Sequence, residues 1–456
     1  MDTRRGRTKF PVTLMVLALL FTLSISVGAT GQTESKTGQG PVTLTVWSVF
    51  DQEGLHKVMV AAIQQFEREH PAVKVEETAR ALDADKAATM AALNAGAGPD
   101  VMTVNNGETM MGPMVRAKYV VDLGPYSAKY GWEQNYLSPS LWDRAKYTPD
   151  GKVFGTGNLY GVPAFGELVG VYYNKDLFKQ LGLKVPETVS ELERNADKLK
   201  GAGTTPMAYG AAEVWPFFQS WADILGATMA DKIGGDATQK WMSDVVIMGD
   251  PKRGFKDPGV LEAAQVIRRW ADSDYFFKGF TGIMIDDAMT LFVAGKAGMF
   301  LQGSWYCSPV AEAGFAAGMF AFPPMKKETG MTPQVGGMMT PLGININSKH
   351  QELAAEFLNT LLASPEAHKL EAEIFVLPPK VPADLSIAKE GSVFYDMLVL
   401  WNQMNAKNRV GQYFDWTTPT MGDEPAGQEL LSGNITPQQF VEKMQANYSA
   451  WVSSKR

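Results

Sequence analysis

Apolar and other residues alternate with a period of two over VTLTVWSVF, residues 42–50, which is the pattern of a half-buried β-strand. Apolar residues then recur at helical spacing from Leu55 to Phe66, and Pro71 closes this segment. The expected strands of this region lie at 42–50, 73–76 and 101–104, with a second helix at about 84–95. Strands and helices alternate in this way in an α/β domain with a mainly parallel sheet, which the pattern therefore predicts.

The stretch YGVPAFGELVGVYYNKDLFKQLGL, residues 160–183, combines strand-like runs, a sharp polar stop and a short helix. The strand-like runs are Tyr160–Val162 and Val169–Tyr173, and Asn174–Asp176 forms the turn. Glu167 is a single carboxylate within the apolar part. Similar patterns continue beyond it. Expected helices fit 186–200, 214–226, 259–274, 286–295, 350–363, 365–373, 393–405 and 436–452, and expected strands fit 298–302, 318–322 and 342–346.

Residues 1–29 have the pattern of a signal peptide. Four basic residues precede the apolar stretch PVTLMVLALLFTLSISV, and Val27–Ala29 provides small residues for cleavage. We expect cleavage there and a flexible linker over residues 30–40. An uncleaved membrane anchor is the alternative, because the apolar run is near the lower length limit for spanning a bilayer. Cys307 is the only cysteine, so neither a lipid anchor at the cleavage point nor an intramolecular disulfide is expected.

Charge and motif content exclude several classes of protein. The formal net charge of −7 argues against a nucleic-acid-binding protein, which needs a basic face to neutralise phosphates. The four histidines show no paired spacing and have no neighbouring cysteine. No G-x-S-x-G or P-loop pattern stands between a strand and a helix. We therefore expect no catalytic residues, no metal site and no cofactor.

Six segments of the chain, in order, resemble one protein family. They are VTLTVWSVF, GAGPDVMTV, YGVPAFGELVGVYYNKDLFKQLGL, LFVAGKAGMFLQGSW, residues 320–369 and LSGNITPQQFVEKMQ. Together they are similar to the extracellular solute-binding proteins of ABC importers, in the sugar-binding group that includes the maltose-binding type. Phe165 departs from the family, which usually has a small or short polar residue there. The resemblance implies an α/β, two-lobed periplasmic-binding-protein fold of type II, with a ligand cleft between lobes joined by hinge strands.

The resemblance also implies where the lobes divide. The expected segments are 41–163 plus 341–378 for lobe 1, 164–340 plus 379–456 for lobe 2, and 162–167 and 336–341 for the crossings between them. Glycines in the second crossing would permit backbone rotation at low cost.

Carbohydrate recognition needs flat aromatic surfaces for the C–H faces of a sugar ring and planar polar groups for its hydroxyls. We expect both near the carboxyl ends of strands, where open α/β sheets place ligands. The aromatic candidates are Trp47, Trp215, Trp305 and Trp416, and the polar candidates are Asp51, Glu53, Asn105, Asn106, Glu108, Glu167, Asp287 and the backbone of Gly337. In sugar-binding relatives the position of Trp305 commonly stacks on the ligand. Three of these candidates also have a purely structural alternative. Glu167 would then be a carboxylate facing solvent, Asp287 a helix cap, and Gly337 a hinge residue.

The resemblance implies a binding protein rather than an enzyme. It would capture a mono- or oligosaccharide between its lobes, close by hinge bending, and deliver the ligand to the membrane permease subunits of an ABC importer. We expect a monomer in the periplasm or outside the cell. Three alternatives stay open: a ligand-sensing protein for a membrane receptor, a secreted glycoside hydrolase with two carboxylates flanking one bond, and a binding protein for a polyol or glycerol phosphate.

Overall fold

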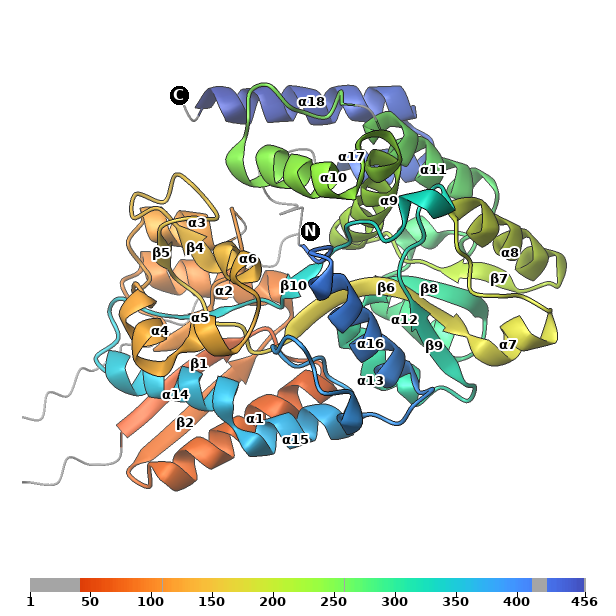
Figure 1. Ribbon diagram of the computed structural model, residues 1–456. Coiled ribbons are helices and arrows are strands. Elements are labelled where there is room, and N and C mark those ends of the chain that lie inside the picture. The colour runs from red at the N-terminus through yellow and green to blue at the C-terminus, as the bar shows by residue number, and fades with distance from the viewer. Residues whose placement is uncertain (1–41, 109, 258, 412–424, 455–456) are drawn as a thin grey trace, which may run out of the picture. The chain divides into compact units, whose positions relative to one another are not determined.

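The computed structural model describes residues 42–454 apart from 109, 258 and 412–424, and two β-sheets organise this part of the chain (Figure 1). The first sheet has the strand order β11–β3–β1–β2. Its strands are β1 Val42–Ser48, β2 Val73–Ala79, β3 Val101–Thr103 and β11 Leu342–Ile344. β1 pairs in parallel with both β2 and β3, whereas β11 runs antiparallel to β3. We call the part built on this sheet lobe 1.

α1 (Glu53–Glu69) packs on lobe 1 through the apolar positions that its spacing predicts. Its buried residues are Leu55, Val58, Met59, Ala62, Ile63 and Phe66. The ring of Phe66 meets that of Phe357 edge to face at 5.4 Å, which joins α1 to α14. The other elements of lobe 1 are α2 Leu82–Asn94, α3 Met111–Arg116, α4 Gly124–Tyr130, α5 Trp132–Asn135, α6 Pro139–Trp142, β4 Lys146–Tyr147, β5 Asn158–Leu159, α14 Gln351–Ala363 and α15 Pro365–Glu373.

The second sheet has the order β10–β6–β8–β7, with β9 also paired to β6, and we call the part built on it lobe 2. Its strands are β6 Gly166–Asn174, β7 Thr205–Ala208, β8 Ala297–Gly303, β9 Ala317–Phe320 and β10 Gly336–Met338. Nearly every residue of β6 is buried, as in a strand covered on both faces. The principal helices are α7 Lys175–Gln180, α8 Val189–Gly201, α9 Trp215–Ile233, α10 Gly235–Met242, α11 Val260–Asp272, α12 Ile285–Val293, α13 Cys307–Ala311, α16 Val393–Ala406, α17 Pro425–Ser432 and α18 Pro437–Ser454.

Three chain segments lie side by side where the chain passes between the lobes. The first residues of β6 pair antiparallel with β10, so that Glu167 stands opposite Gly337. The N–H of Gly166 donates a hydrogen bond to the carbonyl of Leu377 at 2.9 Å, which adds the segment after α15. The residues at which the lobes divide stay a prediction.

Phe165, the departure from the family pattern, lies at this junction. Its ring is fully buried and packs edge to face against Phe50 at 5.0 Å. The extra aromatic bulk therefore fills the core between the crossing segments.

Local patterns mispredicted some elements. Residues 160–162 form no strand and make only an isolated bridge at Val162, because Pro163 has no N–H to donate. α9 runs past its expected end at Gly226 as far as Ile233, since this glycine lies inside the helix. The short helices α3 to α6 were not predicted, because so few turns show no periodicity. The expected signal peptide and linker lie outside the described residues.

Candidate ligand-binding cleft

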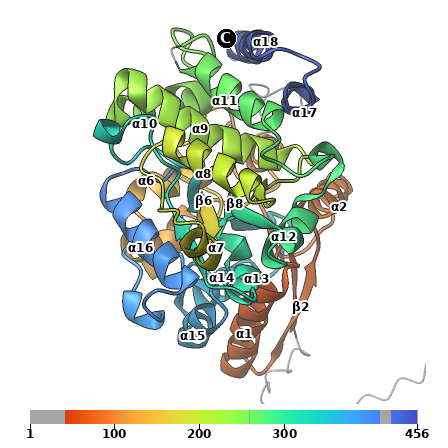
Figure 2. The same cartoon turned by 90° about the vertical axis from the view of Figure 1, so that its right-hand side faces the viewer.

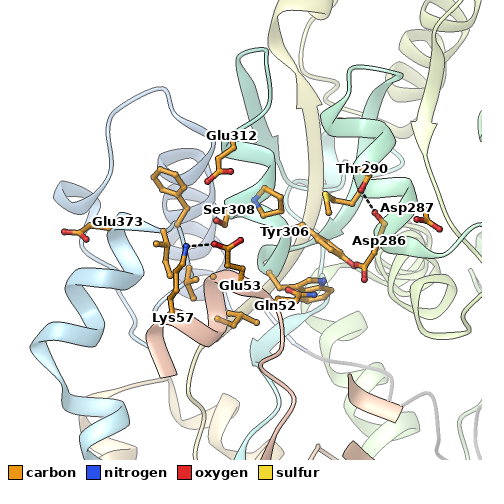
Figure 3. A pocket seen from close by; sticks show the side chains of 18 residues that line it. Gln52, Glu53, Lys57, Asp286, Asp287, Thr290, Tyr306, Ser308, Glu312 and Glu373 are labelled. Carbon is orange, nitrogen blue, oxygen red and sulfur yellow. Dashed lines mark hydrogen bonds and ion pairs between the residues drawn. The ribbon is translucent and has the colours of Figure 1, made fainter. Parts of the chain in front are cut away.

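A cavity of about 470 Å³ lies between the lobes, beside the N-terminal end of α1 and the start of α12 (Figure 3). Figure 2 shows α1 below α12 and α13. Lobe 1 contributes the start of α1 and the segment after α15, and lobe 2 contributes α12, α13 and the short turn after β8. The polar side chains of the wall are Gln52, Glu53, Lys57, Asp286, Asp287, Thr290, Tyr306, Ser308, Glu312 and Glu373 (Figure 3). Hydrogen-bonding groups from both lobes thus face one space.

Trp305 supplies an aromatic surface to this cavity. It sits in the one-turn helix Ser304–Tyr306 directly after β8, and its ring lies across the backbone of Gly303. A Cβ atom added at Gly303 would lie 2.0 Å from the indole, so only glycine allows this position. Trp215, the first residue of α9, meets Trp305 edge to face with ring centroids 6.1 Å apart. The structure therefore brings two of the predicted tryptophans together.

Glu213 is a residue of this region that the sequence analysis missed. Its Oε1 accepts a hydrogen bond from the indole Nε1–H of Trp215 at 3.2 Å, and its Oε2 accepts one from the backbone N–H of Ile285 at 2.9 Å. One carboxylate thus orients Trp215, which packs against Trp305 but does not itself line the cavity, and accepts a backbone N–H in the first turn of α12. Its place two residues before Trp215, ahead of a helix, was the available signal.

Asp286 is the second residue that sequence patterns did not single out, since Asp287 was chosen instead. The hydroxyl of Tyr306 donates a hydrogen bond to Asp286 Oδ1 at 2.5 Å. Burial and this carboxylate both raise the pKa of Tyr306, which keeps the phenol protonated as the donor. Asp51, predicted from the end of the first strand, belongs to lobe 1. Partial burial raises the pKa of Asp51, and the charge of Asp286 raises it further, so the two carboxyl groups interact across the lobes.

Two predicted polar residues, Glu53 and Asp287, line the cavity directly. Glu53 forms an ion pair with Lys57 at 2.6 Å, one turn further along α1. Asp287 is exposed in the first turn of α12, where a carboxylate also stabilises the positive end of a helix. Contact of either residue with a ligand stays a prediction.

Glu167 and Gly337 lie at the crossing between the lobes and not on the wall of the 470 Å³ cavity. The interpretation of Glu167 as a solvent-facing carboxylate is wrong, because the residue is only 5% exposed. Burial raises its pKa to about 7, although the charge of Arg144 acts in the opposite direction. Gly337 has a φ of 136°, which disfavours any other residue. Arg144 also lines a second cavity of about 400 Å³ between α6 and α10.

Asn105 and Asn106 follow β3 and are buried rather than open to the cavity. The side-chain Oδ1 of Asn105 accepts the N–H of Asn106 at 2.9 Å, and its backbone carbonyl accepts the N–H of Met111 at 3.0 Å. These bonds shape the turn that leads into α3. Their role as ligand contacts stays a prediction.

Glu108 and Trp47 also lie away from the cavity wall. Glu108 forms an ion pair with Arg116 at 2.5 Å. The guanidinium of Arg80 lies over the half-buried ring of Trp47, 4.4 Å from its centroid, and makes a cation–π contact. Both side chains therefore have partners within lobe 1. Trp416 lies outside the described residues.

Within the part of the chain that the structure describes, no group of three or more His, Cys, Asp or Glu side chains is arranged to hold a metal ion. No helix of the same residues is long and apolar enough to cross a membrane.

Two α/β lobes, joined by crossing strands with a cavity between them, define a two-lobed binding protein of the type II periplasmic-binding-protein fold. The sequence profile of the bacterial extracellular solute-binding protein family matches residues 52–369, well over half of the chain. The chain therefore belongs to this family, as the sequence resemblance implied, and the family consists of extracellular binding proteins.

Individual relatives agree with this assignment. The chain is 25% identical over 348 residues to the multiple sugar-binding protein of Streptococcus mutans, covering 74% of this chain and 75% of that protein. It is 26% identical over 385 residues to the galactooligosaccharide-binding protein of Bacillus subtilis, covering 83% and 82%. A structure from work on xylan utilisation by Caldanaerobius polysaccharolyticus matches with a TM-score of 0.72 at 24% identity, covering 89% of this chain and 99% of that one. This likeness confirms the predicted fold.

Proposed function

We propose that the protein binds a carbohydrate outside the cytoplasm and delivers it to the permease subunits of an ABC importer, without catalysing a reaction on it. The observation that carries this proposal is the indole of Trp305 on the wall of the interlobe cavity, beside the carboxylates of Asp286 and Glu53. An aromatic face and planar acceptors in one space match the C–H face and the hydroxyls of a sugar. The sugar-binding relatives support the same ligand class.

Closure of the cleft follows from the two-lobed arrangement. A ligand in the cavity touches Trp305 on lobe 2 and Glu53 on lobe 1, and it gains both sets of contacts only when the lobes are together. It therefore shifts the equilibrium between open and closed forms toward the closed one. The paired strands at Glu167 and Gly337 act as the hinge, and the importer releases the ligand by favouring the open form.

Further parts of the proposal concern export and assembly. We propose that residues 1–29 are removed as a signal peptide and that the mature chain acts as a monomer without a lipid anchor. A membrane receptor in place of the importer would use the same cleft. Capture of membrane partners by the sugar-loaded protein distinguishes a permease from a receptor.

The direct test is a titration of the purified mature protein with a panel of neutral mono- and oligosaccharides, followed by tryptophan fluorescence and calorimetry. We expect saturable binding of one sugar class and an affinity at least tenfold weaker in Trp305→Ala, because truncating a tryptophan that dominates a binding interface typically costs about 2 kcal/mol or more. The same mixtures, analysed by chromatography, should show the sugar unchanged.

The matched control is Trp47→Ala, which removes a half-buried tryptophan located away from the cavity wall. We expect this variant to keep the affinity of the parent protein. An equal loss in both variants would contradict the assignment of the cavity. Polyols or phosphates that bind while sugars do not would contradict the ligand class, and cleaved sugar would contradict the absence of catalysis.

A further inference from the structure

The interlobe cavity has a strongly asymmetric charge. Five carboxylates and one ammonium group line it, and the ammonium group of Lys57 is already paired with Glu53 at 2.6 Å. The carboxylates come from both lobes: Glu53 and Glu373 from lobe 1, and Asp286, Asp287 and Glu312 from lobe 2. A ligand between the lobes is thus faced by negative groups on two sides, and no unpaired cation of the lining is available to an anion.

Among these groups, Asp286 is a carboxylate whose position is fixed by a hydrogen bond from the cavity wall. The hydroxyl of Tyr306 fixes one of its oxygens at 2.5 Å, so that the carboxylate cannot swing away from the cavity wall freely. Its charge also acts on Asp51 in lobe 1. Burial is the largest cause of the raised pKa of Asp51, and the charge of Asp286 raises that pKa further. Asp286 therefore acts on the space between the lobes from a defined place.

We propose that this end of the cleft selects its ligand by charge: it accepts a neutral or cationic carbohydrate, rejects one that carries phosphate or carboxylate, and uses Asp286 as a main determinant. The proposal rests on the function put forward above, and it excludes glycerol phosphate from the ligands that the family resemblance left open. Sugar hydroxyls and ammonium groups donate hydrogen bonds to carboxylates, whereas an ionised carboxylate or phosphate group on a sugar has no proton to donate and is repelled by their charge. Closure expels water and strengthens both the attraction and the repulsion.

The charge of the cavity can be measured without any sugar. Tryptophan fluorescence is quenched with CsCl or with KI at constant ionic strength, and each quenching constant is divided by that of N-acetyltryptophanamide. The difference between the parent protein and Trp305→Phe isolates the contribution of Trp305. We expect caesium to quench this contribution roughly threefold better than iodide, since a negative surface concentrates cations and excludes anions.

Asp286→Asn should move the ratio of caesium to iodide quenching of Trp305 toward one, and the amide keeps an oxygen acceptor for Tyr306. Asp83→Asn is the matched control, because Asp83 is also the second residue of a helix and exposed, but lies outside the cavity wall. It should leave the ratio unchanged. Equal quenching of Trp305 by the two ions, or an equal effect of the two substitutions, would overturn the proposal.

A second arm uses the neutral sugar found in the panel together with its uronic acid or phosphorylated analogue. We expect the anionic analogue to bind about tenfold more weakly or worse, because like charges brought together in an interface strongly oppose binding. In Asp286→Asn the difference in affinity between the neutral and the anionic sugar should be smaller. Equal affinity for both sugars would refute charge selection. If no sugar binds, the proposed function fails, and the quenching ratio still decides whether the cavity discriminates by charge.

Discussion

The carboxyl group of Glu167 is buried where the chain crosses between the lobes, opposite Gly337. Removal from water disfavours its charged form and raises its pKa to about 7, from an ordinary value of 4.5. Between these two values the folded protein binds a proton that the unfolded chain releases. The protonated carboxyl of Glu167 therefore makes the folded state more stable at low pH than at neutral pH, and this contribution to the unfolding free energy is lost as the pH rises from 4.5 through 7.

Glu167→Gln should remove this pH dependence. The shift corresponds to about 3 kcal/mol of unfolding free energy, so urea unfolding at pH 5, 6, 7 and 8 should show a smaller decline in the variant than in the parent protein. Other buried acids also titrate, such as Asp85 with its pKa raised by burial to about 6, so the difference between the two proteins is the quantity to compare. Asp83→Asn neutralises an exposed carboxylate and should keep the parent slope. The same slope in Glu167→Gln would show that Glu167 is ionised throughout.

At the level of elements, the start of α12 depends on a side chain distant in sequence. The N-terminal N–H groups of a helix have no partner within the helix. Glu213, in the loop before α9, accepts a hydrogen bond from the N–H of Ile285, the first residue of α12. The same carboxylate holds the indole of Trp215. Because Asp286 and Asp287 follow directly in α12, this bond also positions the acidic wall of the cavity.

Glu213→Ala should therefore disturb α12 and Trp215 together. We expect a loss of about 1–2 kcal/mol in unfolding free energy, the usual effect of removing a helix-capping acceptor, and a change in the near-ultraviolet circular dichroism of tryptophan. Glu213→Gln is the conservative control, since it retains one oxygen acceptor and should recover part of the loss. If Glu213→Ala matches the parent protein in both measurements, the bridge has no structural role.

These examples show how far the sequence could predict the molecule. The helix α1 was predictable because the spacing of Leu55 to Phe66 is a local pattern. The partnership of Glu213 with α12 was not, because it joins residues 72 positions apart. Trp47 is expected near the ligand from its place at the strand end; the structure places it away from this cavity wall, in contact with Arg80, which is also a distant relationship that the local pattern does not contain.

For the whole molecule, the proposed function depends on relative movement of the lobes, and the two lobes approach closely beside the cavity. Gly54 in α1 faces Ser308 in α13: a Cβ atom built on Gly54 would lie 3.6 Å from the Cβ of Ser308. This distance falls within the range of about 3.5–4.5 Å found between the Cβ atoms of disulfides. The close approach joins lobe 1 to lobe 2 away from the crossing strands, so a covalent link there opposes hinge movement.

The double substitution Gly54→Cys with Ser308→Cys should form a disulfide under oxidising conditions and hold the lobes in the arrangement described. Hinge closure requires free rotation at the crossing strands, so a saturating sugar should change the radius of gyration, measured by small-angle X-ray scattering, only in the reduced variant. Dithiothreitol should restore the response. Gly54→Cys and Ser308→Cys alone are the controls, since Cys307 is buried and each adds one thiol without its partner. An oxidised double variant that still contracts or expands with sugar would mean that binding does not require movement between the lobes.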